Sequence, residues 1–246
     1  NGVSAGKKIQ RLLETPDPVW GSRKVEETDI TLENVTFSYD NERQVLKDIN
    51  MTFPKVGMSA IVGESGCGKS TIVRLIDGNS VPLNGQIRVG TTPLKELSRR
   101  DFYSHISVVS YNTYLFNDTV RNNFLLAAPD ATEKQMKEAL EKVNLWKFIQ
   151  ENGGLDKEIK EATSNIDVES EAIIMKNIKA LSKKKSVIVI SHRLENIVPA
   201  DQIYFLAAGE VKEHGSHKEL MAAGKGYAAL YNRQKALEEG YREVIA

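Results

Sequence analysis

The first third of the chain shows the alternation of apolar and polar residues that is typical of half-buried strands. Residues 30–37 predict one such strand, and residues 45–53 predict a second one after the turn at residues 40–41. Since only a short turn separates the two, we expect them to form an antiparallel hairpin. Residues 58–62 are apolar except for Ser59 and predict a buried strand.

After residue 70 the apolar spacing changes to that of helices, and helices then alternate with short apolar runs. The predicted helices are residues 71–76, 94–103, 132–143, 145–149 and 169–181, followed by a mostly helical tail from His217. The further predicted strands are residues 86–89, which follow a turn at residues 84–85, and residues 106–109, 187–190 and 203–206. This alternation predicts an α/β fold with a helical block inserted at about residues 113–160.

Residues 1–28 have the character of a linker. Ile9, Leu12 and Leu13 share one face of a short amphipathic helix, which the prolines at positions 16 and 18 stop. We therefore expect a linker over residues 1–28 and one domain over residues 29–246.

Composition excludes several classes of protein. The 33 basic and 33 acidic residues cancel, so nothing indicates a nucleic-acid binder. No apolar run approaches the roughly 18 residues that span a bilayer, and no signal peptide opens the sequence. The single cysteine, Cys67, forms no internal disulfide and is typical of a reducing cytosol.

The clearest chemical motif follows the strand at residues 58–62. Residues 63–71 fit the pattern Gly-x4-Gly-Lys-Ser and lead into a helix, which is the context that a phosphate-binding loop requires. Its glycines let backbone N–H groups surround a polyphosphate, Lys69 would neutralise the β and γ phosphates, and the Ser70 hydroxyl would hold Mg²⁺. The candidate nucleotide-binding residues are Gly63, Glu64, Ser65, Gly66, Cys67, Gly68, Lys69, Ser70 and Thr71.

Two residues outside this loop are further candidates. Tyr39 ends the first strand, where its ring could stack on a purine base or simply pack on the surface. His192 follows the strand at residues 187–190, at the carboxyl end where open α/β sheets bind ligands, and is either catalytic or a loop histidine. The other three histidines, His105, His214 and His217, are interpreted as surface residues.

Together these motifs resemble the nucleotide-binding domain of ATP-binding cassette (ABC) transporters of the exporter type. Besides the phosphate loop and Tyr39, residues 110–120, 161–167, 190–193, 207–210 and 215–220 occur in the order of that family. The resemblance implies a P-loop NTPase (RecA-like) core with an antiparallel β subdomain and a helical subdomain, with ATP and Mg²⁺ as ligands.

The resemblance also assigns roles to individual residues. Tyr39 would stack on adenine, His192 would sense the γ phosphate, and Glu161 would be the general base that polarises the attacking water. A loop containing Ser164 and Asp167 would cross to a partner domain.

The sequence departs from the family pattern in the stretch before Glu161 and at position 111. It has no Leu-Ser-Gly-Gly-Gln signature, and Lys160 stands where the family has the magnesium-ordering aspartate of the Walker B strand. The stretch before Glu161 is too short to contain a helix and a strand of ordinary length, so at least about fifteen to twenty residues of the family pattern are absent from it. We hypothesise that the sequence joins two stretches across a missing segment, which leaves the helical subdomain truncated. Tyr111 replaces a metal-contacting glutamine and lacks the amide carbonyl.

The implied function is that of an ATP-hydrolysing motor of an exporter. Its partners would be a second nucleotide-binding domain, in a homo- or heterodimer, and a membrane domain of the same polypeptide, on the cytoplasmic side of a membrane. A catalytically degenerate regulatory half of a heterodimer is the alternative. A P-loop kinase or GTPase is disfavoured because no Asn-Lys-x-Asp stretch is present.

Overall fold

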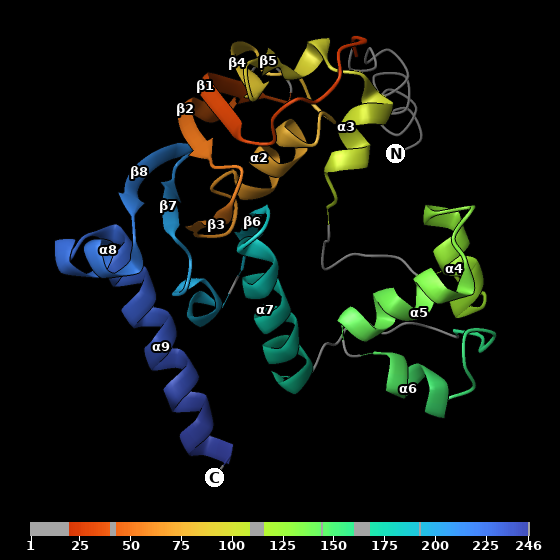
Figure 1. Cartoon of the computed structure of the whole chain (residues 1–246). Coiled ribbons are helices and arrows are strands. Elements are labelled where there is room, and N and C mark those ends of the chain that lie inside the picture. The colour runs from red at the N-terminus through yellow and green to blue at the C-terminus, as the bar shows by residue number, and fades with distance from the viewer. Residues whose placement is uncertain are drawn as a thin grey trace, which may run out of the picture. The chain divides into compact units, whose positions relative to one another are not determined.

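The computed structural model describes residues 20–39, 43–108, 116–143, 145–159, 168–191 and 193–245 (Figure 1). The chain forms two compact units, one made of Asn1–Ser107 and Lys185–Ala246 and the other of Val108–Lys184. The predicted amphipathic helix at residues 9–13 lies outside the described residues. The predicted α/β class is confirmed, because both parallel and antiparallel strands alternate with helices.

An antiparallel sheet of the first unit contains the predicted hairpin. Its strands are β1 (Ile30–Ser38), β2 (Gln44–Phe53), β4 (Asn84–Val89) and β5 (Thr92–Pro93), in the order β2-β1-β4-β5. Ile30 faces Phe53 on one side and Val89 on the other. Asn84 and Gly85, which the sequence predicts as a turn, belong to β4 instead, because Asn84 pairs with Thr36 of β1.

A second sheet carries the phosphate loop. Its strands are β3 (Gly57–Gly63), β6 (Ser186–Ile190), β7 (Gln202–Ala207) and β8 (Glu210–Gly215), in the order β6-β3-β7-β8. Strand β3 runs parallel to both β6 and β7, and β8 closes one edge antiparallel to β7. The carboxyl ends of β3 and β6 therefore lie next to each other at one edge of the sheet.

The structure confirms the strand predicted at residues 187–190 as β6, whereas the described part of the strand predicted at residues 106–109 is not a strand. Residues 106–108 are not in a strand, and half of the Val108 side chain is exposed (51%). Strand β6 forms, but it lies at the edge of the sheet formed by the described strands, and only Val189 in it is buried. An apolar strand is normally covered on both sides by neighbouring strands, so β6 has the composition of an interior strand at an edge position.

The predicted helix at residues 94–103 is split into a single 3₁₀ turn over Leu94–Glu96 and helix α3 (Arg99–His105). Arg23 forms a parallel bridge with Leu97, its N–H donates to the carbonyl of Glu96, and its carbonyl accepts from Ser98. These bonds hold Leu97 extended and buried, and the Ser98 hydroxyl then caps α3. Pairing with the segment before β1 thus interrupts the helix.

Both sheets of the first unit contribute to one hydrophobic core. Helix α2 (Lys69–Ile76) buries Ile72 and Leu75 there, and Phe102 of α3 is fully buried. Trp20 packs against the Phe102 ring, with ring centroids 5.2 Å apart. The end of the predicted linker therefore packs on the domain.

The second unit is mostly helical over its described residues. It contains α4 (Val120–Ala127), α5 (Glu133–Lys142), α6 (Trp146–Glu151) and α7 (Val168–Ser182). Val120, Met136, Leu140 and Leu155 form its small buried core. Thr132 and Gln135 form a capping box at the start of α5.

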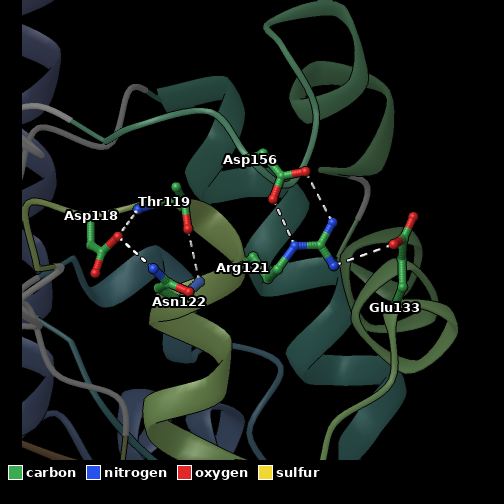
Figure 2. A network of polar contacts seen from close by, with 6 residues as sticks. All are labelled: Asp118, Thr119, Arg121, Asn122, Glu133 and Asp156. Carbon is green, nitrogen blue, oxygen red and sulfur yellow. Dashed lines mark hydrogen bonds and ion pairs between the residues drawn. The ribbon is translucent and has the colours of Figure 1, made fainter.

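Polar contacts connect these short helices (Figure 2). Arg121 of α4 donates to both carboxylate oxygens of Asp156, at 2.7 and 3.1 Å, and to Glu133 of α5 at 3.2 Å. The Arg121 guanidinium holds the pKa of Asp156 below its usual value. One arginine thus connects the start of α4 with the start of α5 and the turn that follows α6.

Candidate functional site

The phosphate loop joins β3 to α2 through three glycines with positive φ angles. These are Gly63 (φ 152°), Gly66 (φ 78°) and Gly68 (φ 111°). A Cβ atom at Gly63 would lie 2.2 Å from the carbonyl oxygen of Leu206, on the neighbouring strand β7. Only glycine accepts both this backbone conformation and this proximity, so the loop can wrap closely around a ligand.

Lys69 opens α2 and points back into the loop. Its ammonium donates to the carbonyl oxygens of Gly63 and Glu64, both at 2.8 Å, and lies 3.7 Å from Cys67 Sγ. The side chain is only 6% exposed. Since an ammonium has three N–H donors, the two carbonyls fix its position and leave one donor with only a weak sulfur contact. The positive charge is therefore held at the loop before any anion binds.

The structure brings Tyr39 to the same place. The Tyr39 hydroxyl lies 3.0 Å from Oγ1 of Thr71, in the first turn of α2, and the ring packs edge-on against Phe37. Tyr39 is nevertheless 58% exposed. An aromatic ring beside the loop can stack on a base, and this role stays a prediction.

Several predicted site residues lie outside the described residues: Tyr111, Glu161, Ser164, Asp167 and His192. Their roles remain predictions. For His192, the preceding strand β6 pairs with β3 as far as Ile190, opposite Ile61. Ile190 therefore lies at the sheet edge at which the phosphate loop begins.

The residues present fit a magnesium ion that arrives with a nucleotide. Ser70 lies next to Lys69 in the first turn of α2, and its side chain is exposed. Within the described part of the chain, no three His, Cys, Asp or Glu side chains gather as a metal site. Mg²⁺ commonly keeps several waters and binds phosphate oxygens with only one or two protein ligands, so the Ser70 hydroxyl is a suitable ligand.

One contact of the loop was not predicted from the sequence. Arg233 of the C-terminal helix α9 (Gly226–Ile245) forms an ion pair with Glu64, with Nη2 and Oε1 2.7 Å apart. The two residues are 169 positions apart in the chain, and no sequence motif connects them.

The comparisons with known proteins agree with this geometry. Residues 46–165, which include the phosphate loop, match the family model described as ABC transporter. The chain belongs to the ABC transporter family. An uncharacterized ABC transporter ATP-binding protein of Haemophilus influenzae is 36% identical to it, over 99% of this chain and 50% of that protein.

Exporters are among the similar proteins. A putative multidrug export ATP-binding/permease protein of Staphylococcus aureus is 32% identical, over 86% of this ABC chain and 42% of that protein. The structure of a bacterial Atm1-family ABC exporter with ATP bound superimposes with a TM-score of 0.83 at 25% identity, over 95% of this chain and 47% of that one. The chain spans about half the length, or somewhat less, of these relatives.

The H. influenzae alignment also bears on the missing signature. It runs over 278 positions, whereas this ABC chain has 246 residues, so at least 32 aligned positions have no residue here. The edge position of the apolar strand β6 is consistent with a missing neighbouring strand. Both observations support the hypothesis of an absent segment, whose place beside Lys160 stays a prediction.

Proposed function

We propose that this chain binds and hydrolyses MgATP as the motor domain of an exporter. The observation that carries the proposal is the Lys69 ammonium, which is buried and held by two loop carbonyls beneath a glycine-rich turn. Such a preformed cationic loop at the end of a parallel strand suits a nucleoside triphosphate.

Each part of the site would have its own role in binding MgATP. Loop N–H groups and Lys69 would bind the β and γ phosphates, Tyr39 would stack on adenine, and Ser70 would hold Mg²⁺. Bound Mg²⁺ would neutralise charge on the phosphate oxygens. Most of the rate acceleration in phosphoryl transfer comes from such positioning and charge stabilisation.

The remaining steps depend on residues outside the described part of the chain. Glu161 would orient and polarise the attacking water, and His192 would contact the γ phosphate. Ser164 and Asp167 would belong to a loop that reaches a second nucleotide-binding domain. As the sequence stands, this chain would receive a signature motif from that partner without offering one in return.

The partners follow from the relatives' names and lengths. The S. aureus relative is described as an ATP-binding/permease protein, of which this chain spans less than half. We therefore propose that a membrane domain accompanies this chain and that ATP-driven pairing of two motor domains on the cytoplasmic side drives transport. None of the helices in the described residues is long and apolar enough to cross a bilayer.

Nucleotide titration tests the proposal directly. Calorimetry with MgATP should give saturable binding to the wild-type chain. Lys69→Ala should weaken it by about 100-fold or more, because charge-assisted bonds to phosphate are lost in a buried setting. Lys55→Ala, which removes an exposed lysine between β2 and β3, is the matched control and should bind as the wild type does. Unchanged binding by Lys69→Ala would refute the assignment of the loop.

A further inference from the structure

The C-terminal helix α9 faces the phosphate loop across a cavity of about 470 Å³. Four of its residues line the cavity with the spacing i, i+3, i+4 and i+7, so they share one face of the helix: Gly226, Ala229, Leu230 and Arg233. Three of the four are small or apolar. Arg233 is therefore the residue of this face that brings a charge to the loop.

The start of α9 is firmly anchored to the first unit. Tyr227 is fully buried, its hydroxyl is hydrogen-bonded to Nδ1 of His217 at 2.7 Å, and its N–H donates to Glu213 Oε1 at 2.9 Å. A Cβ atom at Gly226 would lie 2.6 Å from the Phe205 ring, so α9 packs tightly on β7 there. Arg233 follows two helical turns later, which fixes the direction from which it approaches the loop.

The partner of Arg233 is an acidic residue inside a loop built for anions. The carboxylate of Glu64 pairs with Arg233, while the Glu64 carbonyl accepts hydrogen bonds from Lys69 Nζ at 2.8 Å and from the Cys67 N–H at 3.3 Å. Glu64 thus belongs to the structure that positions the lysine. A carboxylate at this point repels a polyphosphate unless a cation compensates its charge.

We propose that Arg233 is a positioning residue that sets nucleotide affinity by neutralising the Glu64 carboxylate and holding it on the α9 side of the loop. This inference rests on the proposed binding of MgATP to the loop. It makes the C-terminal helix part of the nucleotide site, although Arg233 itself acts through Glu64.

The size of the effect follows from the exposure of the pair. The Arg233 and Glu64 side chains are 63% and 67% exposed, so solvent screens their interaction. Arg233→Ala should raise the Kd for MgATP about two- to five-fold, which corresponds to about 0.4–1 kcal/mol. The melting temperature without nucleotide should stay close to that of the wild type, because exposed pairs contribute little to stability.

A double-mutant cycle separates this role from general electrostatics. Glu64→Ala removes the carboxylate with which Arg233 pairs, so adding Arg233→Ala in this background should leave the Kd for MgATP at the value of Glu64→Ala alone. Lys225→Ala removes an equal charge from the residue before α9 and is the matched control. At about 1 M KCl the difference between Arg233→Ala and the wild type should disappear, since the Debye length falls to about 3 Å.

Two results would overturn the inference. One is an unchanged Kd for Arg233→Ala while the wild type binds MgATP, which leaves the proposed function intact. The other is a rise in the Kd for MgATP that is just as large when Arg233→Ala is added to Glu64→Ala as when it is made in the wild type, because Arg233 would then act independently of Glu64. Absence of MgATP binding by the wild type would instead refute the proposed function as well.

Discussion

Replacing Gly63 with alanine tests whether the geometry of the phosphate loop depends on the missing side chain. The added Cβ atom would lie 2.2 Å from the Leu206 carbonyl oxygen and 2.7 Å from Cys67 Sγ, at a φ of 152°. The first clash involves backbone on β7, which cannot rotate away. Gly63 must therefore move, and its carbonyl is one of the two that hold Lys69.

Two costs contribute to the expected loss. A strained backbone conformation costs about 1–3 kcal/mol, and overpacking costs about 1–3 kcal/mol more. We expect the free energy of unfolding of Gly63→Ala to fall by about 2–6 kcal/mol, with a melting temperature lower by about 4–24 °C. The Kd for MgATP should rise at least about tenfold, or about 1.4 kcal/mol, because Lys69 loses one of its anchors.

Gly66→Ala is the matched control for stability. Gly66 also has a positive φ, of 78°, but a Cβ atom there would meet nothing within 4 Å. Only the backbone preference remains, at about 1–2 kcal/mol. Urea denaturation without nucleotide compares the two variants. The reasoning is refuted if Gly63→Ala is no less stable than Gly66→Ala.

Three further predictions concern other parts of the chain. Tyr39→Ala should weaken MgATP binding by about 1–3 kcal/mol through lost stacking, whereas Tyr39→Phe, which loses only the bond to Thr71, should cost about 1 kcal/mol or less; calorimetry that finds both equal would exclude stacking. Arg121 lowers the pKa of Asp156 from its ordinary value of 3.8. The contribution of the Arg121–Asp156 pair to folding stability is therefore present above pH 3.8 and is lost as the pH falls below it. Acid denaturation followed by circular dichroism should show that stability falls more steeply with decreasing pH below 3.8 in the wild type than in Asp156→Asn. Equal slopes of stability against pH would contradict this. If the natural protein contains a segment beside Lys160 that the present sequence lacks, residues 156–166 are not contiguous in it. Digestion of the natural protein before aspartates should then yield no peptide of residues 156–166, and mass spectrometry that finds this peptide would remove the hypothesis.

The strands around the phosphate loop could be predicted because their signals are local. Residues 58–62 are apolar except for Ser59, and the glycine spacing after them defines the turn into α2. The hairpin of β1 and β2 was likewise predicted from alternation and a short turn, and it is confirmed. In each case the whole pattern lies within a short run of consecutive residues.

Predictions failed where a distant segment decides the local structure. The helix at residues 94–103 is interrupted because residue 97 pairs with residue 23, and β8 was missed because it is defined by its pairing with β7. His217, interpreted as a surface residue, is partly buried against Tyr227. The strand predicted at residues 106–109 is absent from its described part, although its composition is that of a strand.

The sequence by itself determined the phosphate loop and the α/β class, because glycine spacing and apolar periodicity are properties of consecutive residues. The order of its motifs supplied the resemblance to the ABC family, which the comparisons then showed. Only the tertiary structure placed Tyr39 beside Thr71, placed Arg233 on Glu64 and left β6 at a sheet edge. These features are contacts between residues far apart in the chain. Such contacts depend on how strands and helices pack, and no local pattern records them.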